Sequence, residues 1–368
     1  MAGHRAMKTI VHVVGARPNY MKIAPLIRAL EGADGCQQLL VNTGQHYDEA
    51  MARGFIRDLD LPTPDYDLGV GSGTHAVQTA KVMATFEELC VERRPALVVV
   101  VGDVNSTLAA SLVAAKLVIP LAHVEAGLRS NDRTMPEEIN RIVTDRLSDL
   151  LLTPSVDANE NLLAEGVPAS RIHLVGNIMI DSLMRHLAHA NLDRVRDRMP
   201  VEKGRYAVLT LHRPSNVDRP EVFTRILTAV TAIAEQMPVV FPVHPRTRQR
   251  LHEFGFEDSL RCLIVTEPLG YVDFLSLTSN ARLILTDSGG LQEESTALGI
   301  PCLTLRENTE RPATVTHGTN QVVGTDTGVI LAGFRTALAR TGVPRRPDLW
   351  DGRTAERIAR VLTNFLSA

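Results

Sequence analysis

Two carboxylates stand where short apolar segments end. Asp103 follows "VVVVG" and Glu125 follows "LAHV". A carboxylate at a buried strand end needs a partner or has a raised pKa, and a raised pKa suits general acid–base chemistry near neutral pH. Together with Glu137 and His212 they form a titratable set, although each one alone could be a structural cap of the helix that follows.

A doubled glycine follows another apolar segment. The stretch "LILTDSGGLQEE" places Ser288, Gly289 and Gly290 between a strand and a helix, where free backbone N–H groups and the helix dipole favour a phosphate. Ser288 or Asp287 could also simply cap this helix. The sequence contains neither GxxxxGK[ST] nor a dinucleotide fingerprint after a strand, so neither of those phosphate sites is predicted.

Cationic side chains also follow predicted strands. Arg17 comes after "VHVVGA", Lys22 lies in the next helical pattern, and Arg311 precedes a proline in a loop after a strand. A guanidinium group can hold a phosphate through two hydrogen bonds. The alternatives are a surface lysine with an extended stem for Lys22 and a surface ion-pair cluster around Arg311.

The composition narrows the class of protein. The chain has 368 residues, 39 Lys+Arg and 42 Asp+Glu, with a net charge of −3. This charge argues against a protein that binds nucleic acids or membrane surfaces. The four cysteines form no CxxC pair, and no HExxH occurs, so we expect no metal and no cofactor. The N-terminal apolar segment is too short for a signal peptide, and no apolar segment is long enough to span a membrane, so we expect a cytoplasmic protein.

Short apolar segments alternate with helical patterns along the whole chain. Continuous apolar strands separated by helices predict an α/β fold with doubly wound parallel sheets. The pattern restarts near residue 205, so we expect two Rossmann-like domains with a cleft between them. We place the first domain at residues 1–175, joined by a C-terminal helix at 353–368, and the second at residues 176–352. Ligands of such sheets bind beyond the carboxyl ends of the strands.

Several motifs, in order, resemble the non-hydrolysing UDP-N-acetylglucosamine 2-epimerases. They are "GARPNYMKIAPL", "NTGQHYDEAM", "VVGDVNSTLA", "AHVEAGLRSNDRTMPEEINR", "LTLHRPSNVD", "FPVHPRTR", "LTDSGGLQEE" and "TLRENTERPATV". The resemblance covers nearly the whole chain and implies the GT-B fold of two Rossmann-like domains. It also implies inversion of C2 of UDP-GlcNAc to give UDP-ManNAc, by anti elimination of UDP to 2-acetamidoglucal and re-addition of UDP. A homodimer without nucleic-acid or membrane partners is expected.

The resemblance also assigns residues to roles. The catalytic positions are Asp103, Glu125, Glu137 and His212. The substrate- and UDP-binding positions are Arg17, Lys22, Arg213, His244, Phe274, Ser288, Gly289, Gly290, Glu294 and Arg311. Asp103 and Glu125 are expected near C2 and the N-acetyl group, with Glu137 as the alternative proton carrier. His212 is expected at the leaving phosphate, and Asp132, Arg133 and Glu138 as ordinary ion-pair or helix-start residues.

The exact sugar stays open at this point. "GARPN" departs from the family's common "GTRPE", and "LHRPSNVD" departs from "HRRE". The alternatives are a related UDP-2-acetamido sugar such as a uronate, a hydrolysing 2-epimerase that releases ManNAc and UDP, a GT-B glycosyltransferase and a non-catalytic nucleotide-sugar sensor.

Bacterial relatives are known for an effector site that binds UDP-GlcNAc. The positions that match it are Gln45, Glu137, Arg213 and His244. Asp48 stands where those relatives have a second glutamine, and "GVGSGTH" lacks their arginine. An acidic group facing a diphosphate and the loss of a cation would both weaken the site, so we expect no strict requirement for this activator.

Overall fold

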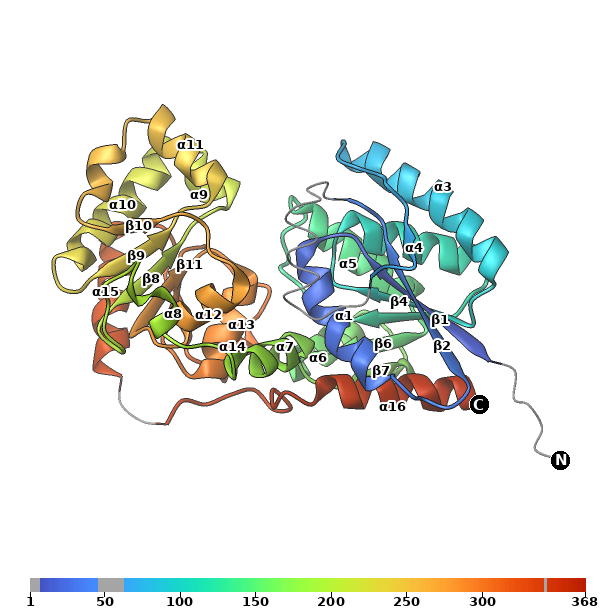
Figure 1. Ribbon diagram of the computed structural model, residues 1–368. Helices are drawn as coiled ribbons and strands as arrows, with labels where there is room; N and C mark the ends of the chain where they lie inside the picture. The colour runs from blue at the N-terminus through green and yellow to red at the C-terminus, as the bar shows by residue number, and fades with distance from the viewer. Residues whose placement is uncertain (1–6, 46–62, 341–342) are drawn as a thin grey trace. The chain divides into compact units, whose positions relative to one another are not determined.

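The computed structural model describes residues 7–45, 63–340 and 343–368, and of Arg17 only the backbone. The chain divides into two compact units, which are described separately. Unit 1 is formed by Met1–Ser182 together with Asp348–Ala368, and unit 2 by Leu183–Pro347. In each unit, helices lie along a central sheet (Figure 1).

Unit 1 contains a seven-stranded sheet in which every strand pair is parallel. Its strands are β1 (Lys8–Val14), β2 (Cys36–Asn42), β3 (Tyr66–Asp67), β4 (Leu97–Val101), β5 (Leu121–Val124), β6 (Leu150–Thr153) and β7 (Ile172–Leu174). Its helices are α1 (Arg17–Ala29), α3 (His75–Arg93), α4 (Asn105–Lys116), α5 (Pro136–Leu147), α6 (Val156–Ala164), the 3-10 turn η1 (Ala169–Arg171) and α16 (Thr354–Ser367), with α7 (Ile178–Leu187) at the unit boundary. The strand order is β3-β2-β1-β4-β5-β6-β7.

Unit 2 contains a six-stranded parallel sheet in the order β10-β9-β8-β11-β12-β13. Its strands are β8 (Ala207–Thr210), β9 (Val239–Pro242), β10 (Ile264–Thr266), β11 (Leu283–Thr286), β12 (Cys302–Thr304) and β13 (Asn320–Val322). Its helices are α8 (Asp193–Arg196), α9 (Pro214–Val217), α10 (Pro220–Ala234), α11 (Pro245–Glu253), the 3-10 turn η2 (Glu257–Leu260), α12 (Tyr271–Thr278), α13 (Gly289–Leu298), α14 (Ala313–Thr316) and α15 (Thr327–Ala339).

The prediction of doubly wound parallel sheets is confirmed. All five residues of β4, "LVVVV", are buried, as expected for a strand whose sheet is covered on both faces. The strand order reverses between β1 and β4 in unit 1 and between β8 and β11 in unit 2. Such a reversal leaves a crevice beyond the carboxyl ends of the two strands, so each unit has one preferred place for a ligand.

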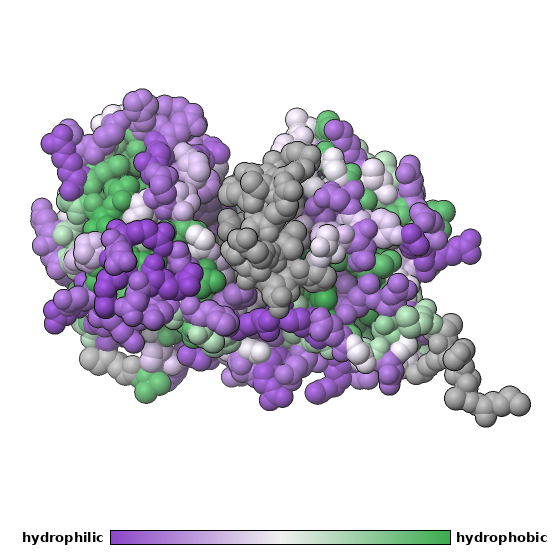
Figure 2. Space-filling view, in the orientation of Figure 1, coloured by the Kyte–Doolittle hydropathy of each residue, from purple (hydrophilic) through white to green (hydrophobic). Residues whose placement is uncertain are grey.

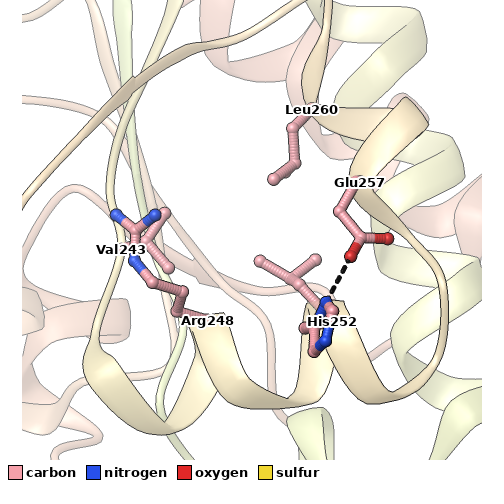
Figure 3. A pocket seen from close by; sticks show the side chains of 6 residues that line it. Val243, Arg248, His252, Glu257 and Leu260 are labelled. Carbon is pink, nitrogen blue, oxygen red and sulfur yellow. Dashed lines mark hydrogen bonds and ion pairs between the residues drawn. The ribbon is translucent and has the colours of Figure 1, made fainter.

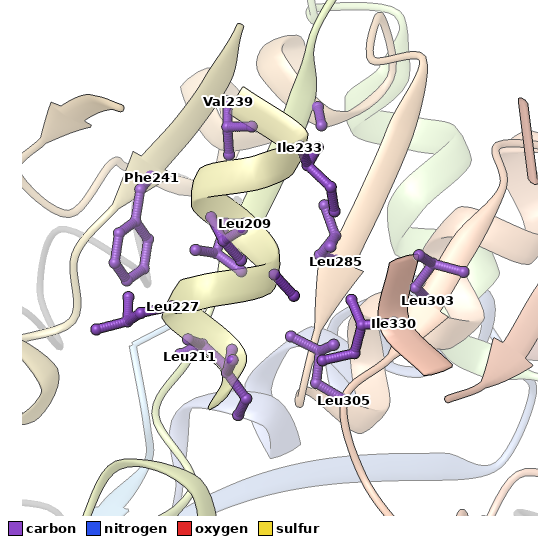
Figure 4. Packing of buried hydrophobic residues seen from close by; sticks show 14 of the residues in the cluster. Leu209, Leu211, Leu227, Ile233, Val239, Phe241, Leu285, Leu303, Leu305 and Ile330 are labelled. Carbon is purple, nitrogen blue, oxygen red and sulfur yellow. The ribbon is translucent and has the colours of Figure 1, made fainter. Parts of the chain in front are cut away.

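The core of unit 2 forms where α10 packs on the sheet (Figure 4). Leu227 and Ile233 of α10 are buried against Leu209 of β8 and Phe241 of β9. The buried positions of this helix recur at intervals of three and four residues, which places them on one face. Each fully buried side chain of this size contributes about 1.5–3 kcal/mol to folding.

The division between the units falls inside α7 rather than in a linker. We predicted a boundary between residues 175 and 176, which lies in the short connection between β7 and α7. The division into compact units falls a few residues later, after Ser182. Whether each unit is an independent domain stays a prediction.

The C-terminal helix α16 belongs to unit 1. The carboxylate of Asp181 accepts hydrogen bonds from the backbone N–H groups of Thr354 at 3.1 Å and Ala355 at 2.7 Å, which satisfies the first donors of α16. Trp350, just before this helix, is buried and donates from Nε1 to the carbonyl of Pro154 at 3.0 Å.

Hydrophilic residues predominate on the face of the molecule in Figure 2, as the composition leads one to expect. Within the described ranges, no helix is long and apolar enough to cross a membrane.

Candidate active site

Glu125 and Lys22 meet at the reversal point of unit 1. Lys22, from α1 after β1, forms a buried ion pair with the carboxylate of Glu125, which follows β5. A Cβ at Gly102, which follows β4, would lie 3.2 Å from Lys22 Nζ and 3.4 Å from Glu125 Oε2. Glycine at residue 102 therefore leaves room for the pair beside the end of β4. Lys22 is a buried partner of the predicted catalytic carboxylate and is no surface lysine.

Asp103, the second predicted catalytic carboxylate, is paired with an arginine. Oδ2 of Asp103 lies 2.6 Å from Nη2 of Arg141, and Nη1 of the same arginine lies 2.5 Å from Oε2 of Glu138. Arg141 and Glu138 are both buried on α5. The sequence did not single out Arg141. Its only signal was its spacing of three residues from Glu138, which allows an ion pair on one helix face.

Two neighbouring carboxylates at the start of α5, Glu137 and Glu138, differ in their partners. Glu138 accepts hydrogen bonds from the backbone of Ser130 and Asn131, each at 2.9 Å, so its predicted role at the helix start is confirmed. Glu137 is half-buried in the first turn of α5, and its carboxylate has no partner among the described residues. Glu137 is thus free to meet a ligand.

Two further predicted positions lie in unit 1. Gln45 is buried, and its Oε1 accepts from the backbone N–H of Ser106 at 3.1 Å and from its hydroxyl at 2.7 Å. Arg17 begins α1 after β1, and its side chain lies outside the described atoms. Asp48, which entered the effector argument, also lies outside the described residues.

His212 and Asp287 meet at the reversal point of unit 2, after β8 and β11. Nδ1 of His212 lies 2.8 Å from Oδ1 of Asp287, with 42% of the histidine side chain exposed and none of the aspartate's. The carboxylate also accepts from the backbone N–H groups of His212 and Arg213. Burial alone would raise the pKa of Asp287, but these bonds and His212 lower it. An ionised Asp287 orients the imidazole so that its other nitrogen is presented outward.

The alternative that Ser288 or Asp287 caps α13 through its side chain is contradicted by the structure. Ser288 is the N-cap residue but makes no side-chain cap hydrogen bond, and Asp287 binds the end of β8 instead. The N-terminus of α13 therefore keeps free backbone donors that an anion can accept.

His244 is placed beside His212. Their ring centroids are 5.9 Å apart, and Nδ1 of His244 accepts from the backbone N–H of Arg246 at 3.3 Å. Burial, followed by the nearby His212, lowers the pKa of His244. A pocket of about 270 Å³ opens beside the preceding residue, Val243 (Figure 3). Because its lining includes none of the predicted site residues, this pocket is not the candidate active site.

Three arginines surround two buried glutamates near the N-terminus of α13. Glu310 pairs with Arg306 at 2.9 Å and with Arg311, and its Oε1 lies 3.7 Å from Nη2 of Arg213. Glu293 lies 2.9 Å from Nε of Arg311. Burial would raise the pKa of Glu310, but the arginines hold it well below its usual range. The cluster carries one more positive than negative charge, which favours an anion.

Gly289 and Gly290 stand at the start of α13, close to this cluster. A Cβ at Gly289 would lie 2.6 Å from Nη1 of Arg311, whereas one at Gly290 would meet nothing within 4 Å. Gly289 is therefore required for Arg311 to lie across the helix start, and Gly290 leaves open space for a ligand.

Glu294 is a buried carboxylate on α13. Its Oε1 accepts a hydrogen bond from the hydroxyl of Tyr271 at 3.1 Å. Burial raises the pKa of Glu294 to about 7, against the opposing effect of Tyr271. Phe274, one turn along α12 from Tyr271, is half-buried against the core. The sequence did not identify Tyr271, because only the fold brings its hydroxyl to Glu294.

Comparisons with known proteins decide the family. A family model described as UDP-N-acetylglucosamine 2-epimerase matches residues 28–363. The chain belongs to this family. UDP-N-acetylglucosamine 2-epimerase of Methanocaldococcus jannaschii is 43% identical over 95% of this chain and 98% of its own length. A crystal structure of that epimerase in complex with UDP-GlcNAc and UDP matches with a TM-score of 0.89, covering 97% of this chain and 99% of the other.

One relative in the epimerase family has a different sugar in its name. UDP-2,3-diacetamido-2,3-dideoxy-D-glucuronate 2-epimerase of Pseudomonas aeruginosa is 38% identical over 97% of this chain and 99% of its own length. The GT-B-like fold of the epimerases and the predicted family are thus confirmed, while the roles of individual site residues stay predictions.

Proposed function

We propose that this chain catalyses the reversible inversion of C2 of UDP-GlcNAc to give UDP-ManNAc. The observation that carries the proposal is the Lys22–Glu125 pair beside Asp103 at the reversal point of unit 1, in a chain 43% identical to an epimerase solved with UDP-GlcNAc and UDP. Carboxylates held at a strand end are suited to moving a proton at a sugar carbon.

The proposed reaction is an elimination followed by an addition. The C2 hydrogen is weakly acidic, so its removal by a carboxylate is coupled to cleavage of the C1–O bond to UDP, which gives 2-acetamidoglucal. Protonation of C2 from the opposite face and return of UDP to C1 complete the inversion. Asp103 and Glu125 are assigned to C2 and the N-acetyl group. Glu137, whose carboxylate is not engaged within the described part of the chain, is the second proton carrier.

Unit 2 is assigned to the nucleotide. His212, oriented by Asp287, stabilises the charge that develops on the departing phosphate. The diphosphate-binding positions proposed in unit 2 are Arg213, His244, Ser288, Gly289, Gly290 and Arg311, and the substrate-binding positions proposed in unit 1 are Arg17 and Lys22. Glu294 is assigned to the ribose hydroxyls and Phe274 to the uracil ring. Holding UDP after cleavage lets it re-add instead of leaving.

The test is turnover of UDP-GlcNAc in heavy water, with separation of UDP-GlcNAc, UDP-ManNAc, UDP and free sugar. Deuterium at C2 of UDP-ManNAc is the expected result. Release of free ManNAc and UDP would indicate a hydrolysing epimerase instead. No turnover combined with tight UDP-GlcNAc binding would indicate a sensor.

A uronate substrate is the second candidate, because the Pseudomonas aeruginosa relative is 38% identical over 97% of this chain. The two sugars are distinguished by comparing kcat/KM for UDP-GlcNAc and for UDP-2,3-diacetamido-2,3-dideoxy-D-glucuronate. A homodimeric state and a cytoplasmic location are also proposals, to be checked by light scattering and cell fractionation.

A further inference from the structure

Asp145 is a buried carboxylate that uses both oxygens on the turn that carries Glu125. Oδ1 lies 2.6 Å from Nδ1 of His123, and Oδ2 accepts from the backbone N–H of Gly127 at 3.1 Å. His123 and Gly127 stand two residues before and two residues after Glu125. A single side chain of α5 therefore holds this turn on both sides of the proposed catalytic carboxylate.

The backbone of this turn is strained. Glu125 has φ +74°, in the left-handed region, and Gly127 has φ +82°. A non-glycine residue held there costs about 1–3 kcal/mol and persists only where the surroundings enforce it. The backbone N–H of Glu125 donates to the carbonyl of Leu152 at 3.0 Å, which is one restraint, and Asp145 supplies the others.

His123 extends the same restraint to Asp103. Its Nε2 lies 2.8 Å from the carbonyl oxygen of Gly102, the residue directly before Asp103. A carbonyl only accepts, so Nε2 of His123 donates to Gly102 while Nδ1 faces the carboxylate of Asp145. The buried His123 thus links the buried Asp145 to the peptide before Asp103.

Arg129 forms ion pairs with Asp145 and with Glu165. Its Nη1 lies 2.7 Å from Oδ2 of Asp145, and its Nε and Nη2 bind the carboxylate of Glu165 at 2.7 and 2.8 Å. Burial alone would raise the pKa of Asp145, but His123 and Arg129 lower it. An ionised Asp145 can accept all three hydrogen bonds that its neighbours offer.

We propose that the His123–Asp145 pair is a positioning device, which holds both the turn of Glu125 and the peptide before Asp103. The pair acts through these two carboxylates and is assigned no contact with substrate. The inference rests on the proposed function, because the positions of Glu125 and Asp103 affect turnover only if these carboxylates act on the sugar.

The first test compares Asp145→Ala with Asp145→Asn. Alanine releases His123 and Gly127, and misplacement of a reacting group by about 1 Å costs about 10²-fold in rate. We therefore expect kcat to fall about 10–100-fold while KM stays nearly constant. Asparagine can still accept from Gly127 and donate to a singly protonated His123, so it should restore most of kcat. An asparagine variant as impaired as the alanine variant would overturn the proposal.

A second variant covers the case in which Asp145→Ala does not fold. His123→Gln retains a donor for the carbonyl of Gly102 but loses the contact with Asp145. We expect kcat to fall about as much as in Asp145→Ala. His12→Asn is the matched control, because His12 is a buried histidine of the same sheet whose Nε2 lies 2.9 Å from Gln38 Oε1. The control should lose stability and keep kcat. Wild-type kcat in His123→Gln would contradict the proposed role.

A crystal structure of His123→Gln or Asp145→Ala separates this inference from the proposed function. The expected result is a changed φ at Glu125 or a rotated Gly102–Asp103 peptide. If wild-type enzyme fails to turn over UDP-GlcNAc, the proposed function fails, while this structural result still decides whether the pair positions the turn. Unchanged backbone at both places would overturn the inference.

Discussion

The two sheets reverse their strand order in the same way, but different described side chains gather near the two reversals. In unit 1, three of the described carboxylates pair with two of the described cations: Asp103, Glu125 and Glu138 with Lys22 and Arg141. In unit 2, three described arginines pair with two glutamates, Arg213, Arg306 and Arg311 with Glu293 and Glu310, and Asp287 pairs with His212. The fold thus fixes where each site lies, and the residues at the strand ends decide whether that site suits a proton or an anion.

The largest expected effect on turnover comes from Glu125→Gln in unit 1. Loss of an acid–base group lowers kcat by about 10²–10⁴-fold, and we expect this loss with an unchanged Kd for UDP. His212→Ala in unit 2 should lower kcat by the same order through loss of leaving-group stabilisation. Steady-state kinetics and UDP titration measure both quantities. Glu88→Gln, an exposed change on α3, is the control. Near-normal kcat in Glu125→Gln would make Glu125 a structural residue.

Arg311→Ala should weaken UDP binding, which Glu125→Gln is expected to leave unchanged. Loss of a hydrogen bond to a charged group costs about 1.5–3 kcal/mol, so UDP should bind about 10–100-fold more weakly. Calorimetric titration with UDP measures the change. Arg194→Ala removes an exposed arginine that pairs with Asp273 at 2.9 Å in the same unit and should leave affinity unchanged. Equal affinities in the two variants would break the contrast between the units.

A pH series sharpens the assignment of unit 2 to the nucleotide. The pKa of Glu294 is raised from 4.5 to about 7 in the folded protein, so the folded state binds more protons between these values. The free energy of unfolding should fall as pH rises through this window, by up to about 3 kcal/mol from this group. Urea unfolding from pH 4.5 to pH 8 measures the fall, and Glu294→Gln should flatten it.

Uridine binding should change in the opposite direction over the same window. An ionised Glu294 accepts hydrogen bonds from ribose hydroxyls, so uridine should bind about tenfold more tightly at pH 8 than at pH 6. Uridine is preferred to UDP here because it carries no titrating phosphate. A pH-independent Kd would remove Glu294 from the ribose site.

A smaller effect is expected from the activator. The predicted effector positions are Gln45 and Glu137 in unit 1 and Arg213 and His244 in unit 2. Because the sequence has the acidic Asp48 where the bacterial relatives have a glutamine, we expect purified UDP-ManNAc alone to be converted without a lag. A long lag that a trace of UDP-GlcNAc abolishes would show that the effector site is retained.

No effect is expected from removal of metal ions. The cations proposed for the diphosphate are arginine side chains, so kcat with UDP-GlcNAc should be the same before and after dialysis against EDTA. Loss of activity that magnesium restores would show that the arginine cluster of unit 2 does not suffice for the diphosphate.

The sequence predicted the sheets and the strand-end residues because both depend on local pattern. Continuous apolar segments between helical ones indicate buried parallel strands, and the residue after each strand must lie at the carboxyl edge. Asp103, Glu125 and His212 were found in this way. The helix start at Gly289 was found by its glycines and its place after a strand.

The pairing of residues that are distant in sequence was not predicted. Arg141 looks like any polar residue of an amphipathic helix, and only the packing of α5 beside β4 brings it to Asp103. Asp287 has the local sequence of a helix cap, yet it accepts from the backbone N–H groups of His212 and Arg213, which follow the neighbouring strand β8. Such choices depend on strand order, which a local pattern does not encode.

The place of α16 in unit 1 has a consequence for how the chain is made. Ile358, Leu362 and Leu366 of this helix are buried, and the carboxylate of Asp181 accepts hydrogen bonds from the N–H groups of Thr354 and Ala355. During synthesis the ribosome releases all of unit 2 before these residues appear. Until α16 has been translated, unit 1 therefore lacks the apolar side chains that this helix packs beside α1, and the uncovered surface is open to chaperones or aggregation, although most of the sequence of unit 1 emerged first.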